Sequence, residues 1–307
     1  MKITTATSHS FHQMGGRGNQ EDSRYPDVDI MPAGQRVFIV CDGVGGCDNG
    51  EVASQLVASI MGTQLEKANL DMELTDDQLL DALDEAYIAL DNAATSDHDE
   101  MGTTLTLLCF HAGGATMAHI GDSRIYHIRP GEGILYRSDD HSLVNQMVHN
   151  GQLTPEEAVN HPQSNVITRC MSPTAADQRR SMATVFHTAN IEAGDYVMLC
   201  SDGVLHCMSD DELVALLEGD GSDEAKAHEM ASRSAGSNDN NTAWLVRVEA
   251  VERDASEELK NDSDSNNQPD VSDTVQSHGS TMWMSELASE RRGKQSLKKR
   301  WFRLFGK

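Results

Sequence analysis

Residues 37–46 read VFIVCDGVGG, and a second apolar run, YVMLC at residues 196–200, is followed by Ser201-Asp202-Gly203. Short apolar runs rich in β-branched residues predict buried strands. A carboxylate at the end of such a strand lies at the rim of the core, and the glycine after it lets the chain turn sharply. One Asp-Gly pair after a strand is commonly just a turn. Two copies far apart in sequence predict a shared acidic site that needs a cation.

Composition limits the class of protein. The chain has 307 residues, of which 38% are hydrophobic and 24% charged, as expected for a globular core with some disordered chain attached. The net charge of −25 argues against nucleic acid as a partner, because phosphate backbones would be repelled, and it favours cation binding. Residues 285–307 hold eight Lys or Arg and two Glu, a net of +6, so the remainder carries −31.

Cysteine usage and the absence of long apolar segments suggest where the protein resides. The six cysteines form no Cys-x-x-Cys pair, and several lie in apolar runs, which favours a reducing compartment over a disulfide framework. Residues 1–10 lack an apolar segment of signal-peptide length, and no apolar run reaches eighteen residues. We therefore expect a cytoplasmic protein.

The order of predicted elements indicates the fold class. Residues 1–46 predict strands, and helices are expected over 49–65, with Val52, Leu56, Ile60 and Met61 on one face, and after the capping box Thr75–Gln78. Segments 103–110, 116–120 and 123–128 predict an antiparallel meander. A polar insertion with two short helices is expected at 139–172, followed by strands at 183–187 and 196–200, helices after Ser209 and over 222–235, and a strand at 242–248. Strands and helices in this order predict an α+β fold with antiparallel sheets.

Three regions of the chain differ in composition. Residues 1–250 predict one folded domain, and residues 251–284, rich in Asp, Asn and Ser, predict a disordered linker. The tail at 285–307 mixes cations with aromatic residues. It could touch an anionic membrane surface, bind a partner, fold back on the acidic domain, or serve only as a solubilising end.

Acidic residues recur at predicted strand ends and turns. Oxygen-rich sites without His or Cys select Mg²⁺ or Mn²⁺, and a pair of such ions can activate water and neutralise a phosphoryl group. Arg17 could bind two phosphate oxygens, or it could form only a surface ion pair with Glu21. The acidic positions are Glu21-Asp22, Asp42-Gly43, Asp122, Asp202-Gly203 and Asp239-Asn240.

Other phosphate and hydrolase chemistries lack their motifs. No cysteine is followed six positions later by Arg, so the loop of thiol phosphatases is absent. Neither G-x-x-x-x-G-K-[ST] nor G-x-S-x-G occurs, which argues against a nucleotide-binding P-loop and an α/β-hydrolase.

The ordered motifs resemble the metal-dependent protein phosphatase family, the protein phosphatase 2C type, in its bacterial Ser/Thr form. The resemblance covers about residues 1–250 and implies a four-layer α-β-β-α sandwich with two central antiparallel sheets. Part of segment 139–172 resembles the flap of bacterial members. The motifs that carry the resemblance are Arg17–Asp22, Asp42–Gly46, Gly102-Thr103-Thr104, Gly121–Arg124, Asp202-Gly203 and Asp239-Asn240.

The resemblance implies a role for each matching position. Asp42 would bridge two Mn²⁺ or Mg²⁺ ions, the Gly43 carbonyl and Asp22 would lie on one side, with Glu21 acting through water, and Asp202 and Asp239 would hold the other ion. Asp122 would share a third, weaker ion with Asp202. Arg17 would bind the substrate phosphate, and Thr103 and Thr104 would support the site. The implied reaction is hydrolysis of protein phosphoserine and phosphothreonine by a hydroxide bridging the ions, in opposition to a Ser/Thr kinase.

Two positions depart from the family pattern. Val44 stands where some members carry a histidine proposed as general acid, so the leaving group must take its proton from water or another residue. His206 stands where many members carry an Asp. The alternatives are a pseudophosphatase that only binds, and a two-metal hydrolase of small phosphate esters.

Overall fold

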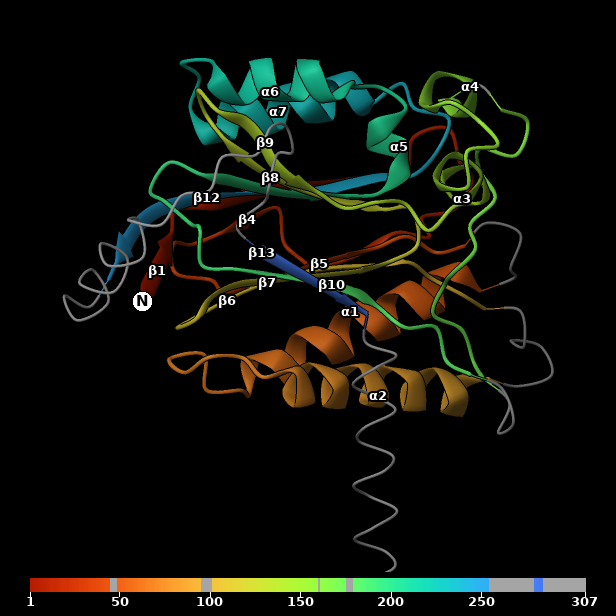
Figure 1. The fold of residues 1–307 in the computed structure, drawn as a ribbon, viewed down its shortest axis with the longest axis horizontal. Helices are drawn as coiled ribbons and strands as arrows, with labels where there is room; N and C mark the ends of the chain where they lie inside the picture. Colours follow the sequence, from red (N-terminus) through yellow and green to blue (C-terminus); the bar gives the residue numbers. More distant parts are fainter. Residues whose placement is uncertain (45–48, 95–100, 160, 175–178, 254–278, 284–307) are drawn as a thin grey trace, which may run out of the picture.

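A computed structural model describes residues 1–44, 49–94, 101–159, 161–174 and 179–253, together with the backbone of 279–283. Two antiparallel sheets face each other and helices cover both outer faces, which gives four layers (Figure 1). The expected α+β sandwich is confirmed. Within the described ranges, no helix is long and apolar enough to cross a membrane.

The first sheet contains strands from both ends of the chain. Its order is β4 (Ile30–Met31), β2 (Ser8–Gln13), β12 (Asn241–Glu252), β11 (Tyr196–Cys200), β8 (Arg124–Arg129) and β9 (Gly133–Arg137), with β1 (Lys2–Thr5) also paired to β12. Helices α6 (Asp210–Glu218) and α7 (Asp223–Ser234) cover its outer face (Figure 1).

The second sheet is built mainly from the middle of the chain. Its order is β13 (Gly279–Trp283), β10 (Thr184–Thr188), β7 (Gly114–Ile120), β6 (Leu105–His111), β5 (Val37–Cys41) and β3 (Ser23–Tyr25). Its outer face is covered by α1 (Gly50–Glu66) and α2 (Asp76–Ala93). The short helices α3 (Leu143–His149), α4 (Pro155–Val159) and α5 (Asp202–Leu205) lie at one end of the sandwich (Figure 1).

The inner strands are apolar on both faces because each face packs on another layer. Every residue of β5 and β11 is buried. Between the sheets, Phe38 contacts Trp244 edge to face with ring centroids 5.1 Å apart. This packing explains why both strands appear in the sequence as continuous apolar runs.

Helix starts match the sequence closely, and the predicted apolar face of α1 packs against the core. The predicted capping box at Thr75 and Gln78 is present. In α1, the fully buried side chains include Ala53, Val57 and Met61, while Val52, Leu56 and Ile60 are only partly buried. The reason is that α1 lies between a sheet and α2, so its apolar residues are divided between two contacts.

The expected three-stranded meander is wrong at its third strand. β6 and β7 pair as predicted, but β8 pairs with β11 and β9 in the other sheet. Gly121, with φ of +104°, lies at the crossing. A Cβ there would lie 2.6 Å from Cγ2 of Thr104, so both the backbone angle and the space require glycine.

The expected linker at 251–284 contains a strand. β12 continues to Glu252, and β13 pairs antiparallel with β10 from Thr188↔Gly279 to Thr184↔Trp283. Without β13, the backbone groups of β10 would form an open sheet edge, and pairing satisfies them. Residues 254–278 and 284–307 lie outside the described residues.

We predict that Gly121→Ala lowers the free energy of unfolding by about 1–3 kcal/mol, because it adds a steric overlap to an unfavourable backbone angle. Gly131 is the matched control, since it also has positive φ, +88°, but nothing lies within 4 Å of a Cβ placed there. Gly131→Ala should cost about 1 kcal/mol. Urea unfolding measures both, and equal losses would contradict the assigned overlap.

Candidate metal centre

The acidic residues predicted from the sequence meet at one end of the sandwich. In the second sheet, Cys41 of β5 pairs with Ser23 of β3, so Asp42 and Asp22 lie beside each other just beyond the paired residues. In the first sheet, Cys200 pairs with both Arg124 and Ala243. Asp202, Asp122 and Asp239 therefore leave the same end of that sheet.

Asp42 lies at the centre of this group. Its backbone N–H donates to Oγ1 of Thr104 (2.9 Å), and its carbonyl accepts from Oγ1 of Thr103 (2.9 Å). Burial, followed by the charges of Asp22 and Asp202, raises the pKa of Asp42 well above its usual range.

Asp22 is the most enclosed of the acidic side chains, with 2% of its surface exposed. The hydroxyl of Ser201 donates to its Oδ2 (2.8 Å), whereas Oδ1 has no hydrogen-bond partner among the described residues. Burial raises the pKa of Asp22 to about 7. A buried carboxylate oxygen without a donor is what a cation would satisfy.

Asp202 and Asp122 form the outer side of the group. Burial, and then the charge of Asp202, raises the pKa of Asp122 to about 7. Burial also raises the pKa of Asp202, opposed mainly by His206, whose Nε2 lies 3.9 Å from Oδ2 of Asp202. A Cβ placed on Gly203 would lie 2.0 Å from the carbonyl oxygen of Asn240. Glycine at 203 therefore allows the backbone after β11 to contact the backbone before β12.

Arg17 pairs with Asp239 rather than with Glu21, the ion pair considered from the sequence. Its Nη2 lies 2.6 Å from Oδ2 of Asp239, and 43% of the Arg17 side chain is exposed. A half-exposed guanidinium beside a carboxylate group can exchange one anionic partner for another, including a phosphate.

Glu21 and Gly43 close the site on the side of the second sheet. The Glu21 N–H donates to Oδ1 of Asn240 (2.9 Å), and the Glu21 carbonyl accepts from the Gly43 N–H (3.1 Å). Burial raises the pKa of the Glu21 carboxyl. These contacts join the two sheets across the acidic group.

The donor set fits hard divalent cations, although the carboxylates are not gathered around one point. Among the described residues, no three His, Cys, Asp or Glu side chains form a ready metal site. Arg17 holds Asp239 and Ser201 holds Asp22, while the charges of Asp22 and Asp202 act on the Asp42 carboxyl. A guanidinium and a hydroxyl thus contact carboxylate oxygens that Mg²⁺ or Mn²⁺ could bind directly, because both ions prefer oxygen ligands.

Two residues named in the sequence motifs, Ser201 and Asn240, have supporting roles that the sequence did not predict. Ser201 holds Asp22, and Asn240, through its Nδ2, also donates to the carbonyls of Met14 and Asn19 (both 2.9 Å). Ser201 directly precedes Asp202, and Asn240 directly follows Asp239. A polar side chain beside a predicted acidic residue is the signal that could have indicated a supporting role. Gly45 and Gly46 of the first motif lie outside the described residues.

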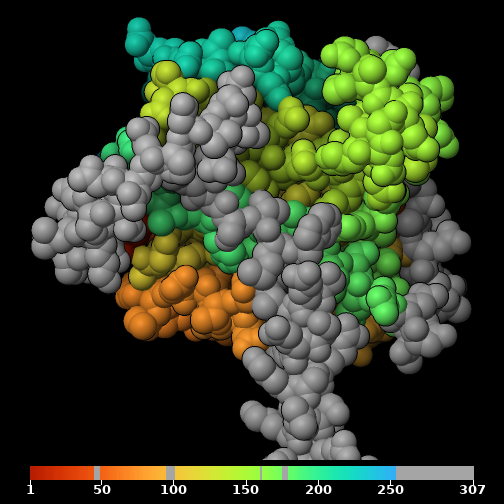
Figure 2. Space-filling model, in the orientation of Figure 1, coloured from red at the N-terminus to blue at the C-terminus, as the bar shows by residue number. Residues whose placement is uncertain are grey.

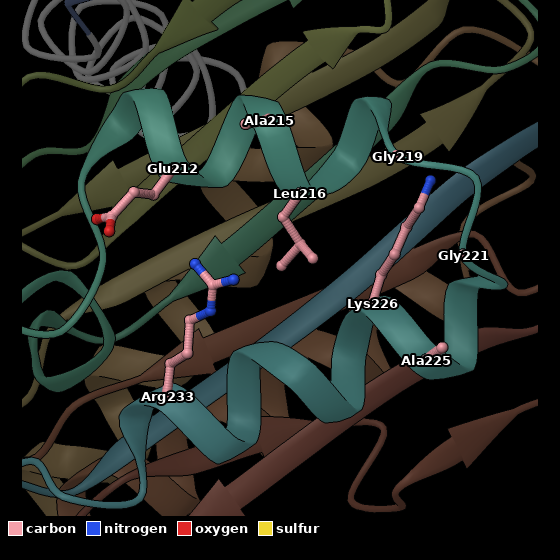
Figure 3. Close-up of a pocket in the computed structure, with 8 residues that line it drawn as sticks. All are labelled: Glu212, Ala215, Leu216, Gly219, Gly221, Ala225, Lys226 and Arg233. Atoms are coloured by element: carbon pink, nitrogen blue, oxygen red, sulfur yellow. The ribbon is translucent and has the colours of Figure 1, made fainter.

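A hollow between α6 and α7 is separate from the acidic group (Figure 3). Nζ of Lys226, at its edge, already donates to the Tyr196 hydroxyl (3.0 Å) and the Leu217 carbonyl (2.7 Å). Arg233 pairs with Glu229. The cations of this hollow are therefore engaged within the protein, and the hollow shares no residue with the carboxylates.

Comparison with known proteins gives a consistent result. The chain matches the family described as protein phosphatase 2C over residues 21–245. It is 35% identical over 247 residues to the protein phosphatase PhpP of Streptococcus pneumoniae, which covers 76% of this chain and 93% of that protein.

Two similar crystal structures are of PstP. The Mycobacterium tuberculosis serine/threonine phosphatase PstP/Ppp is 30% identical with a TM-score of 0.68, over 81% of this chain and all of that one. The catalytic domain of PstP in complex with two manganese ions is 28% identical with a TM-score of 0.63, over 80% of this chain and 99% of that one.

The raised acidic pKa values predict a pH-dependent stability of the metal-free protein. Asp22 and Asp122 titrate near 3.8 when unfolded and near 7 when folded. Between these values the folded state binds more protons, so the free energy of unfolding should fall as the pH rises from about 4 to about 7. Urea unfolding in chelator across this range measures the slope.

Asp42→Asn isolates the contribution of the acidic group, because it removes the titrating carboxyl at its centre, whose pKa is raised well above its usual range. The stability of this variant should fall less steeply over the same pH range than that of the unaltered protein. Identical slopes would mean that the carboxylates do not repel one another.

Proposed function

The chain belongs to the protein phosphatase 2C family, and we propose that it hydrolyses phosphoserine and phosphothreonine on proteins at a dinuclear Mn²⁺ or Mg²⁺ centre built on Asp42. The observation that carries this proposal is that strand ends from both sheets bring their carboxylates to the end of the sandwich where Asp42 lies, with Arg17 beside them. The relatives named as Ser/Thr phosphatases, one of them with two manganese ions, support the same reaction class.

Each predicted ligand has a place in this centre. Asp42 would contact both ions, with the Gly43 carbonyl and Asp22 on one side and Asp202 and Asp239 on the other. Glu21 would act through water, and Asp122 would share a weaker third ion with Asp202. When bound, the ions lower the pKa of water and neutralise charge on phosphoryl oxygens.

The protein's own groups position the substrate. Arg17, released from Asp239, would bind two phosphate oxygens with its planar guanidinium. Thr103 and Thr104 fix the backbone of Asp42 on both sides of its peptide, so that the carboxylate stays in place as charge develops. Val44 cannot donate a proton, so the leaving oxygen takes one from water or from another residue.

The reaction also places the protein opposite a kinase. A phosphatase acting on phosphoserine and phosphothreonine removes what a Ser/Thr kinase adds, and we propose such a pairing in the cytoplasm. A binding-only role is less favoured, because Arg17 and all the predicted acidic ligands are retained.

We predict that Asp42→Asn lowers turnover of a phosphothreonine peptide with Mn²⁺ by about 100-fold or more, the scale of losing a directly acting group. Phosphate release measures it, with circular dichroism confirming the fold. Asp77→Asn, the same change on the exposed first turn of α2, should leave turnover unchanged.

Comparing a phosphopeptide with p-nitrophenyl phosphate, each with manganese and with chelator, separates the alternatives. The proposal expects metal-dependent hydrolysis that favours the peptide. Near-normal activity of Asp42→Asn would reject the site, whereas activity confined to the small ester would reject the protein substrate.

The basic tail carries a second, smaller proposal. Residues 285–307 lie outside the described residues, but their net charge of +6 and their aromatic residues suit the surface of an anionic membrane. Each Lys or Arg near such a surface contributes about 1 kcal/mol.

We predict that the full chain co-sediments with vesicles containing phosphatidylglycerol, that 0.5 M salt releases it, and that a chain ending at residue 284 stays in solution. Neutral phosphatidylcholine vesicles are the control. Equal partitioning of the two chains would discard the membrane contact and leave a partner, the acidic domain or solubility as the role of the tail.

A further inference from the structure

His141 connects segment 139–172 to the loop that carries Asp122. Its backbone N–H donates to the Gly121 carbonyl (2.9 Å), and its ring Nδ1 accepts from the Gly121 N–H (3.1 Å). Its own carbonyl accepts from both the N–H (2.6 Å) and the hydroxyl (2.9 Å) of Thr168. His141 thus binds both backbone polar groups of Gly121 and also Thr168, near the end of the segment.

The ring of His141 is held in one tautomer. Because Nδ1 accepts a hydrogen bond, the proton lies on Nε2, which donates to Oγ1 of Thr184 (2.9 Å). The ring stacks on His119, with centroids 4.5 Å apart and planes 13° from parallel. Burial, and then His119 and Arg169, lowers the pKa of His141 to about 3, so the neutral ring persists at physiological pH.

Gly121 is the residue through which this contact reaches the carboxylates. It directly precedes Asp122, and its φ of +104° leaves the peptide dependent on outside bonds for its orientation. Asp122 is half-buried, and the pairing of Cys200 with Arg124 brings the ends that carry Asp202 and Asp122 together. A rotation of the Gly121 peptide would therefore move the Asp122 carboxylate relative to Asp202.

Segment 139–172 lies beside this end of the sandwich as a raised lobe (Figure 2). Its first residues are also held by Arg124, which forms two hydrogen bonds with Asp140 (2.7 and 2.8 Å). That ion pair joins the segment to β8. The bonds between His141 and Gly121 reach the residue next to Asp122. At its other end, the segment meets the site through Met171, which exchanges two backbone hydrogen bonds (2.9 and 2.8 Å) with Thr103.

We propose that His141 is a positioning residue that couples segment 139–172 to Asp122, and thereby to divalent-ion binding by Asp122 and Asp202. The inference rests on the proposed function, since it assigns a role to Asp122 within that centre. Coupling of this kind is reciprocal: ion binding at Asp122 should order the segment, and the ordered segment should favour ion binding.

Two substitutions divide the ring's contacts. His141→Asn places an amide oxygen where Nδ1 lies and keeps the acceptor for the Gly121 N–H, but it loses the bond to Thr184. His141→Gln places a donor where Nε2 lies and loses the acceptor for Gly121. Thr184→Val removes the hydroxyl at Nε2 but keeps Arg169, whose Nη1 lies 3.4 Å from the same nitrogen, and serves as the matched control.

Manganese calorimetry on the full chain, without substrate, tests the proposal. His141→Gln should raise the dissociation constant of the lowest-affinity manganese ion by about tenfold or more, as expected when a group that orients a metal ligand is lost. His141→Asn and Thr184→Val should stay within about threefold of the unaltered protein. Thermal unfolding should show similar losses for the two His141 variants, which separates positioning from general destabilisation.

Hydrogen exchange gives a second measurement that does not depend on turnover. Manganese should slow exchange of the amides at 164–170 in the unaltered protein and in His141→Asn, but not in His141→Gln. The coupling would be overturned if all variants gave the same manganese isotherm, or if His141→Asn and His141→Gln lost manganese affinity equally. If the unaltered protein bound no manganese, the proposed function itself would fail.

Discussion

The mutual repulsion of buried carboxylates is the constraint on which the site depends. Asp42 lies among Asp22, Asp202, Asp122 and Asp239 in a setting that raises its pKa. Like charges in a medium of low polarity destabilise a fold unless protons or cations balance them. The two sheets, with their fully buried inner strands, supply the stability that lets the chain keep this arrangement.

Polar contacts around the carboxylates restrict where each can lie. Ser201 orients Asp22, Thr103 and Thr104 hold the backbone of Asp42, and Asn240 ties the loop of Asp239 to Glu21. Each contact joins residues distant in sequence. The site is therefore rigid on the side of the sheets, whereas Arg17 and segment 139–172 border it on the side open to solvent.

The sequence predicted the features that are local in origin. Asp42 and Asp202 follow apolar runs whose ends fix their positions, and the capping boxes at Thr75 and Ser209 mark helix starts. What it could not predict depends on contacts between distant segments. The composition of β8 indicates a buried strand but not which strands are its partners. The pairing of Arg17 with Asp239 and the contacts of His141 likewise appear only once the sheets are stacked.

The central claim is that these carboxylates form one site for a pair of divalent ions. Anomalous diffraction at the manganese edge, from crystals grown in manganese, tests it most directly. The account predicts two peaks that share Asp42, with Asp202 and Asp239 at one of them. No peak beside Asp42, or carboxylates that turn toward separate places with no ion between them, would contradict it.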